Sequence, residues 1–423
     1  MTLLKVLICG GGIAGPVLGF WLAKLGHDVT ILERSPDLRA QGQQIDFRGQ
    51  AIEVCRRMGV LDTIRSKVVD EDGLSFVDVY GRTKAVILAN KTGKGAQTFT
   101  SEYEMMRGEL CRIFYDASCS AGVSYRFGAM VTSLEQDDDA VTVHLSDGTS
   151  DRYDLVVGAD GQNSKTRSMI TPPGEPDAFK SLGVWFAYFN IPRQPQDTNL
   201  CTNCNIPNAV MVLRPDNPKT AQAYFGYRPA DEETNLRLRR AYESRDVTRQ
   251  KQVWTDLFRG TGWQSDRILR DLNESNTAEH FYFSEIGQVK TKWWSKGRVV
   301  LLGDAAYCPS GFTGMGTSAA LVGAYVLAGE ISEACRGEGA DDGVRAALQS
   351  YEETMRPYVD KAQKLIPGVP GVAFPRTWFG IWVLQSVVWL LATLRVDKIA
   401  EYFGSDDVGG FKLRDYPNMP REG

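Results

Sequence analysis

The chain has 423 residues, 43% of them apolar, so it can bury a large core and should form two or three domains. A formal net charge of -4 and the absence of a Lys/Arg run argue against nucleic acid as a partner. An apolar strand already begins at Leu3, so we expect no signal peptide. Eight scattered cysteines and only three histidines favour a reducing, cytoplasmic compartment and no metal site. The one close pair, Cys201 and Cys204, is interpreted as two free thiols.

The first elements form a β-α-β unit. Residues 6–8 are a short apolar run, residues 13–25 have helical periodicity, and residues 29–32 are a second strand-like run. Between the first strand and the helix stands the pattern Gly10-x-Gly12-x-x-Gly15. The first glycine permits a tight turn, the second lets a pyrophosphate approach the backbone, and the third lets helix and strand pack closely.

Phosphate is favoured at the N-terminus of such a helix because free N–H groups and the helix dipole attract negative charge. Glu33 ends the next strand and can accept hydrogen bonds from the hydroxyls of an adenosine ribose. The unit therefore predicts a dinucleotide site, and both NAD and FAD fit it.

Further along, residues 140–161 alternate in polarity, turn at Asp147-Gly148 and end in an apolar strand, which indicates a hairpin that returns to the sheet. Residues 297–306 form another buried strand that ends in Gly-Asp. Between these lie aromatic-rich, strand-like segments that indicate an inserted antiparallel sheet: 178–192, 209–213 and 221–227.

The predicted fold is therefore α/β, with a discontinuous Rossmann-like nucleotide domain and an inserted antiparallel substrate domain. We place the nucleotide domain at residues 1–75, 104–172 and 293–365, the substrate domain at 76–103 and 173–292, and a C-terminal helical segment at 366–423.

Three separated motifs resemble the class A flavoprotein monooxygenases of the para-hydroxybenzoate hydroxylase type, over roughly residues 4 to 365. They are the glycine unit with Glu33, the stretch DLVVGADGQNSKTR (residues 154–167), and GRVVLLGDAAYCPSGFTGMGTSAAL (residues 297–321). The resemblance implies that the dinucleotide is FAD, in a domain of the glutathione reductase type, with Asp304 on the FAD ribitol. It also implies that the helix after the glycine-rich turn faces the pyrimidine edge of the flavin.

The resemblance assigns other residues to the cofactor region. Arg107 matches an arginine that approaches the FAD pyrophosphate or ribityl chain, with an ordinary surface arginine as the alternative. Arg34 could lie on the adenine or ribose or be a solvated charge. The full expected cofactor set is Gly10, Gly12, Ala14, Gly15, Glu33, Arg34, Asp46, Arg48, Arg107, Asp160, Asp304, Pro309, Gly314, Met315 and Gly316. Relatives commonly have Gly-Gln-Gly where this chain has Gly314-Met315-Gly316, and often His in place of Tyr307.

No second GxGxxG pattern is present, which fits an enzyme that NADPH or NADH visits only transiently. The resemblance implies that hydride passes to FAD, that O2 adds at flavin C4a, and that the hydroperoxide hydroxylates or epoxidises the substrate. The flavin carries this chemistry, so no catalytic side chain and no metal is assigned. Two alternatives remain open: a flavin oxidase or reductase without oxygen insertion, and a non-enzymatic flavin-binding protein.

The inserted sheet should carry the substrate. Its many aromatic residues suit an apolar, aromatic or polycyclic molecule, although alternating aromatic residues are more often plain sheet core. The stretch AYFGYRP (residues 223–229) resembles a strand of the tetracycline-inactivating monooxygenases. That resemblance implies that Tyr224 and Gly226 lie near a polyketide-like substrate.

The segment 377–394 carries no charge and is bracketed by Arg376 and Arg395. As a helix it would be about 27 Å long, slightly short of the ~30 Å hydrocarbon core of a bilayer. Three interpretations stay open: a helix packed across both domains, a monotopic membrane contact or substrate gate, and a transmembrane anchor.

Overall fold

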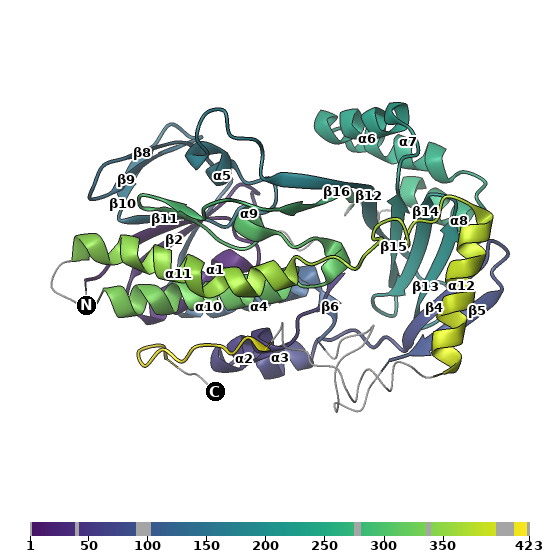
Figure 1. The fold of residues 1–423 in the computed structure, drawn as a ribbon, viewed down its shortest axis with the longest axis horizontal. Helices are drawn as coiled ribbons and strands as arrows, with labels where there is room; N and C mark the ends of the chain where they lie inside the picture. Colours follow the sequence, from purple (N-terminus) through teal and green to yellow (C-terminus); the bar gives the residue numbers. More distant parts are fainter. Residues whose placement is uncertain are drawn as a thin grey trace.

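The computed structural model describes residues 2–38, 42–89, 103–274, 281–335, 340–394 and 410–420. They form two lobes, each built on its own sheet (Figure 1). The glycine-rich motifs lie in the first lobe, and the aromatic-rich strands lie in the second.

The sheet of the first lobe has six strands. Their order is β17 (Ser295–Lys296), β18 (Val299–Leu301), β11 (Leu155–Gly158), β1 (Lys5–Cys9), β2 (Asp28–Glu33) and β7 (Ser124–Phe127). All neighbours pair in parallel except β17 with β18. The central strands consist of buried Val, Ile and Leu, as expected for a parallel sheet covered on both faces.

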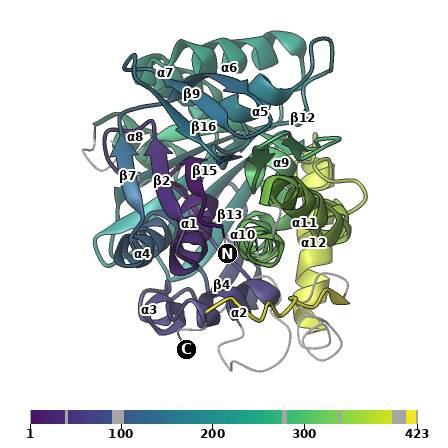
Figure 2. The same ribbon diagram turned by 90° about the vertical axis from the view of Figure 1, so that its left-hand side faces the viewer.

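Helices cover one face of this sheet. Figure 2 shows α4 (Arg107–Ser120), α1 (Ala14–Lys24), α10 (Gly316–Ala334) and α11 (Ala340–Ala362) side by side. The short helices α2 (Gln50–Arg57) and α3 (Leu61–Arg65) pack beyond them. On the other side lie α5 (Lys165–Ile170) and a small sheet of β8 (Val131–Gln136), β9 (Val141–Leu145) and β10 (Ser150–Tyr153). The predicted hairpin is confirmed, because β9 pairs antiparallel with β10 and β11 then returns to pair with β1.

The second lobe contains the predicted inserted sheet, here with seven strands. Their order is β16 (Tyr282–Val289), β12 (Phe179–Pro192), β15 (Thr220–Tyr227), β14 (Ala209–Pro215), β13 (Leu200–Ile206), β4 (Gly73–Val77) and β5 (Thr83–Leu88). It is antiparallel except between β13 and β4. One face is covered by α6 (Glu232–Ser244), α7 (Val247–Phe258) and α8 (Ser265–Glu274).

The two faces of this sheet divide the aromatic residues by strict alternation along β12 and β15. Phe225 and the residues that point to the same side of the sheet pack against the covering helices. The Phe225 ring stacks on Phe258 of α7, with 4.1 Å between ring centroids. Tyr224, by contrast, belongs to a second apolar cluster on the opposite face. One face is therefore plain sheet core, while contact of the opposite face with a substrate stays a prediction.

A short ribbon of β3 (Gln44–Ile45) and β6 (Met105–Met106) joins the lobes. The Gln44 backbone N–H donates to Gln222 Oε1 at 3.0 Å and lies 3.1 Å from Tyr224 Oη. Gln222 Nε2 in turn donates to the Gly42 carbonyl oxygen at 3.1 Å. The substrate sheet thus holds the loop that leads to Asp46.

A buried ionic cluster strengthens the same junction. Arg214 on β14 binds Glu71 through two hydrogen bonds of 3.0 Å and also binds Glu104, which directly precedes β6. Burial, aided by the negative charge of Glu104, outweighs the attraction of Arg214 and raises the pKa of Glu71 to about 7.

This shift predicts a pH dependence of stability. Because the pKa of Glu71 is higher in the folded chain than its ordinary value of 4.5, the folded state binds the proton more tightly. The corresponding stabilisation is present at acidic pH and is lost as pH rises through about 7. We therefore expect the wild type to lose unfolding free energy relative to Glu71→Gln as pH rises from about 4.5 to about 7. Urea unfolding across the pH range measures it, and a constant difference would contradict the assignment.

The C-terminal part of the chain contacts both lobes. Helix α12 (Trp378–Thr393) packs on β5 and β13 of the substrate sheet, and residues 410–420 return to the first lobe. The interpretation of this helix as packed across both domains is therefore replaced by packing on the substrate sheet. Among the described residues, no helix has both the length and the apolar run needed to cross a bilayer.

Candidate functional site

The glycine turn after β1 leaves no room for a side chain at Gly10 or Gly15. Gly10 has φ of +119°, and a Cβ there would lie 2.4 Å from the Ala159 carbonyl oxygen. A Cβ on Gly15 would lie 2.0 Å from the Gly10 oxygen, so this glycine allows α1 to pack against the turn. Helix α1 has no side-chain cap at Ile13 and no acid in its first turn. Its first N–H groups, from Ala14 onward, are thus available to bind a phosphate.

Glu33 lies at the end of β2 beside this turn. Its Oε2 accepts the Gly11 N–H and its Oε1 accepts the Ser35 N–H, both at 2.9 Å. Each carboxylate oxygen has a second lone pair, so Glu33 can still accept ribose hydroxyls. Arg34 is exposed next to it.

Arg107 begins α4 and reaches the same turn. Its Nη2 would lie 3.4 Å from a Cβ on Gly12, and a Cβ on Gly42 would lie 2.8 Å from its Cδ. Cys111, and then Asp304 and Glu33 among its other neighbours, raise the pKa of Arg107. The surface alternative for this arginine does not fit, because its guanidinium lies between the glycine turn and the third motif.

Asp304 begins α9 (Asp304–Tyr307) and is separated from β18 by Leu302 and Gly303. It is exposed to solvent, although the residues on both sides of it in the chain are buried. Burial raises its pKa, against the opposing effects of a hydrogen bond with Cys308 and the charge of Arg107. A polyhydroxyl chain running from Arg107 past Asp304 would find both a donor and an acceptor.

The loop from Pro309 to Gly316 leads into α10. Gly314 has φ of +65°, and α10 begins at Gly316 without a side-chain cap from Met315. Its first N–H groups can therefore stabilise a negatively charged edge of a bound flavin. The loop after β3 meets this point, because Asp46 Oδ1 would lie 3.9 Å from a Cβ on Gly314.

Asp46 and Arg48 form an ion pair at the same place, with Arg48 Nε 3.1 Å from Asp46 Oδ2. The Arg48 backbone N–H donates to Ser318 Oγ in the first turn of α10 at 3.0 Å. The structure thus brings both predicted residues to the loop of residues 309–316, where the resemblance predicts the flavin, and this loop is called the flavin loop below.

Asp160 has a structural use in the described fold. Its Oδ2 accepts the backbone N–H groups of Lys165 and Thr166 at 2.8 and 3.0 Å and so caps α5. Its backbone packs on Gly10. Arg167, at the end of the same motif, was not assigned a role from sequence. It donates to the carbonyl oxygens of Ala305 and Gln162 at 2.9 and 2.7 Å, which fastens the second motif to the third.

The second apolar cluster forms a wall that faces the flavin loop. The Tyr188 ring lies 5.0 Å from the rings of both Tyr224 and Tyr282. Phe374, from the segment before α12, meets Phe186 edge-on at 5.9 Å and Phe312 of the flavin loop at 6.3 Å. Phe374 and Phe312 were missed from sequence, because only folding brings them to the wall.

The two predicted substrate residues belong to this wall in different ways. The Tyr224 hydroxyl donates to Gln222 at 2.5 Å and so belongs to the junction between the lobes, while the Tyr224 ring forms part of the wall. A Cβ on Gly226 would lie 2.8 Å from both Phe186 and Val210, so this glycine allows their close packing.

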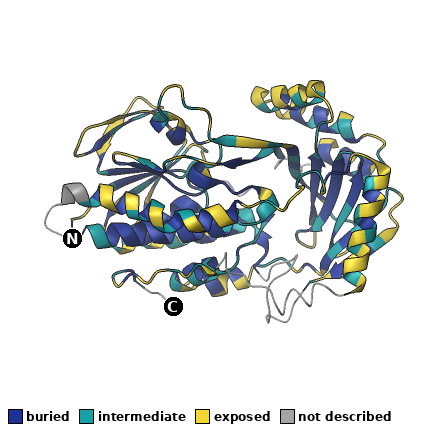
Figure 3. Cartoon of the chain, viewed as in Figure 1, coloured by how far each residue is buried: buried dark blue, intermediate teal, exposed yellow. Residues whose placement is uncertain are grey.

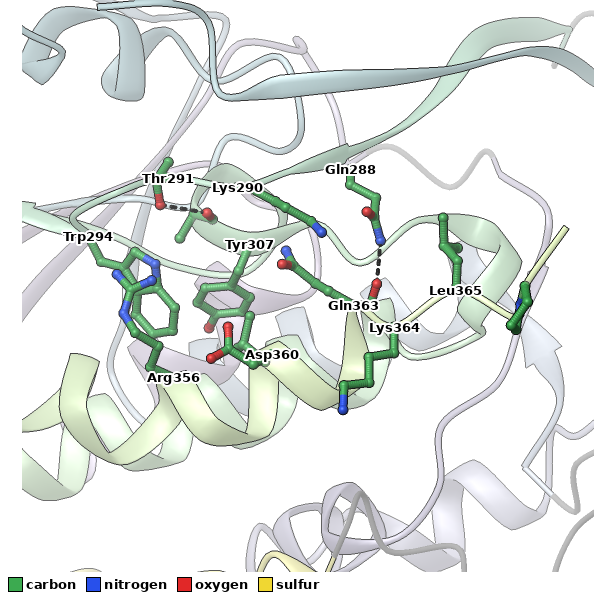
Figure 4. Close-up of a pocket in the computed structure, with 13 residues that line it drawn as sticks. Gln288, Lys290, Thr291, Trp294, Tyr307, Arg356, Asp360, Gln363, Lys364 and Leu365 are labelled. Carbon is green, nitrogen blue, oxygen red and sulfur yellow. Dashed lines mark hydrogen bonds between the residues drawn. The ribbon is translucent and has the colours of Figure 1, made fainter. Parts of the chain in front are cut away.

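A separate cavity of about 670 Å³ lies between the end of β16, α9 and α11 (Figure 4). Gln288, which lines this cavity, donates to the Pro309 and Gln363 carbonyl oxygens at 2.9 and 2.7 Å. None of the expected cofactor residues lines this cavity, so it is distinct from the site above.

Two expected absences concern metals and disulfides. All eight cysteines are free thiols, including Cys201 and Cys204, which are buried. Over the ranges that the structure describes, no three His, Cys, Asp or Glu side chains are grouped to hold a metal ion.

Known proteins resemble the chain in sequence and in fold. The family described as "FAD binding domain" matches residues 3–365. The "FAD-dependent monooxygenase asL4" of Sarocladium schorii is 40% identical over the whole of both chains. The "Flavin-dependent monooxygenase eupH" of a Phoma species is also 40% identical, over 94% of each chain. Among solved structures, the tetracycline destructase Tet(51) superposes with a TM-score of 0.77 at 31% identity, over 98% of this chain and 100% of its own.

Proposed function

The chain belongs to the FAD-binding class A flavin monooxygenases, and we propose that it oxidises an apolar aromatic or polycyclic small molecule with NADPH or NADH as reductant. The observation that supports this substrate class most directly is the aromatic wall on the inner face of the substrate sheet, opposite the flavin loop. Relatives named as monooxygenases disfavour the oxidase and the non-enzymatic alternatives.

When bound, FAD supplies the hydride and oxygen chemistry, and the protein binds it and positions the substrate. We propose that the α1 N-terminus and Arg107 hold the pyrophosphate, that Glu33 holds the ribose and that Asp304 holds the ribitol. The α10 N-terminus would stabilise negative charge on the flavin ring. Two observations support this arrangement. Gly10 has no side chain to obstruct the turn, and the N-termini of α1 and α10 have no side-chain cap.

The wall would orient a flat substrate and exclude water from the flavin loop. Phe186, Tyr188 and Phe374 offer ring faces and edges but no charge, which suits a substrate such as a polyketide-like aromatic. Tet(51), named as a tetracycline destructase, shares this fold at 31% identity and supports a polycyclic substrate. The eight free thiols support a reducing, cytoplasmic setting.

The function is tested by reducing the FAD-loaded protein anaerobically with NADPH and then with NADH, with and without members of a panel of polycyclic phenols. Loss of the flavin absorbance, hastened by one phenol, followed on addition of 18O2 by one labelled oxygen in the product, is the expected result. Product formation without label would support an oxidase instead. Flavin that neither nucleotide reduces would contradict the monooxygenase and would favour an oxidase or a non-enzymatic flavin-binding protein.

Tyr224→Ala is expected to raise KM for such a substrate by about tenfold and to divert reducing equivalents to hydrogen peroxide, because a ring leaves the wall. Tyr224→Phe keeps the ring and removes only its junction hydrogen bonds, so KM should change little. Phe225→Ala is the matched control on the other face, where the loss should appear as lower thermal stability. Equal KM effects for Tyr224→Ala and Phe225→Ala would contradict a substrate-facing wall.

A further inference from the structure

Helix α12 exposes an apolar surface that is unusual for a soluble chain. Its inner side contacts the substrate sheet through Ile381 and Gln385, whose Nε2 donates to the Val77 carbonyl oxygen at 3.3 Å. The other side is visible as an exposed strip at the edge of the second lobe (Figure 3). The large apolar residues exposed there are Trp378, Phe379, Trp382, Val383, Val387, Trp389, Leu390, Leu391 and Leu394.

The size of this surface calls for a partner. Phe379 is 71% exposed, Trp382 62% and Trp389 54%, and each fully exposed aromatic side chain presents roughly 150–250 Å². Together with the exposed aliphatic residues, they exceed the few hundred Å² that monomeric proteins usually leave as one apolar patch.

The shape of the surface indicates what kind of partner fits. At 3.6 residues per turn, the exposed apolar residues of α12 span an arc of roughly 220° around the helix axis. A helix that packs on protein typically presents an apolar stripe of about 100°. A second protein element would cover only part of so wide an arc, whereas lipid can surround every exposed side of a partly immersed helix.

The chemistry of the surface points the same way. Residues 377–394 contain no charged side chain, and the exposed face includes three indoles, which favour the boundary between lipid tails and headgroups. Specific protein interfaces carry roughly one hydrogen bond per 100–200 Å², and this face has few groups to form them. Arg376, which is exposed directly before the helix, is complementary to anionic headgroups, and Arg395 is a second cationic residue that follows the helix in the sequence.

We propose that α12 is a monotopic membrane-docking helix, which lies in the surface of an anionic lipid bilayer with its Trp-rich face immersed. The helix is about 24 Å long and lies flat on the substrate sheet, so docking requires no spanning segment. This proposal concerns the surface alone and does not depend on which substrate the enzyme oxidises.

The test is flotation of the full-length, FAD-loaded protein with vesicles of phosphatidylcholine mixed with phosphatidylserine. The wild type should float with the vesicles, and its tryptophan emission should shift to the blue. Trp382→Gln and Trp389→Gln should each weaken partitioning by on the order of tenfold, from the apolar area removed from the interface. Arg376→Gln should weaken it about fivefold, and high salt should reduce that effect.

Tyr80→Ser is the matched control, because Tyr80 is an aromatic residue that is 79% exposed outside α12. It should leave flotation unchanged, and FAD content and thermal stability should be equal in all variants. A wild type that stays with the unbound fraction, or a Trp382→Gln/Trp389→Gln double variant that floats equally well, would overturn the proposal. So would a dimer in sedimentation experiments that the double variant abolishes, since the face would then be a contact between copies.

Discussion

A Gly10→Ala variant is expected to purify without FAD and to unfold at a lower urea concentration than the wild type. The new methyl group would meet the Ala159 carbonyl oxygen at 2.4 Å, and the backbone at φ of +119° disfavours any side chain. Strain at such an angle costs about 1–2 kcal/mol and overpacking about 1–3 kcal/mol, so the expected loss of unfolding free energy is about 2–5 kcal/mol. Unfolding of FAD-free protein measures this loss separately from cofactor retention, which is read from the flavin absorbance.

The neighbouring Gly11→Ala variant is the matched control. A Cβ there would approach only the flexible Glu33 side chain, at 3.3 Å, and Gly11 does not have a positive φ. Its unfolding free energy should change by less than about 1 kcal/mol. If both variants lost equal stability, the close approach of Ala159 would not be the reason for glycine at position 10.

The second large effect is expected where the C-terminal tail docks. Tyr416 Oη donates to Glu330 Oε1 at 2.6 Å, and Arg414 Nη1 donates to the same oxygen at 3.0 Å. The Glu330 side chain on α10 is only 5% exposed. The Tyr416→Phe/Arg414→Met variant keeps this carboxylate covered but removes both partners.

We expect that double variant to lose about 2–4 kcal/mol of unfolding free energy, chiefly from the buried tyrosine, because Arg414 is half exposed and its ion pair is screened. Adding Glu330→Gln to it should recover part of the loss, because the buried charge is then gone. Thermal unfolding of the three proteins measures the effect. A triple variant that is less stable than the double variant would contradict a charge-based cause.

The tail matters to the cofactor region because of what it touches. Arg57 on α2 binds Asp415 at 2.8 Å and hydrogen-bonds Tyr325 of α10 at 2.5 Å. Helix α2 follows the loop of Asp46 and Arg48, and α10 carries the N-terminus that faces that loop. The last residues of the chain therefore brace two elements of the proposed flavin site.

Local patterns predicted the first lobe well. The spacing of Gly10, Gly12 and Gly15 depends on one turn and one helix, so its consequence is the same wherever the rest of the chain goes. Asp304 was assigned through the family resemblance of its motif, in which a strand is followed by Gly-Asp. A motif does not reveal every contact of its residues. The Asp160 carboxylate caps α5 in this structure. The hydrogen bond by which Arg167 joins the second motif to the third could be identified only from the folded structure.

The sequence by itself determined the nucleotide-binding unit, the alternation of the substrate strands and the uncharged stretch at 377–394, because each is set by neighbours within a few residues. Only the tertiary structure decided which aromatic residues face the flavin loop, that Phe374 joins Phe186 and Phe312, and that one side of α12 stays uncovered. Alternation gives two faces but does not say which face meets another lobe. That choice depends on contacts between residues far apart in the chain, which burial and packing establish only when the whole molecule folds.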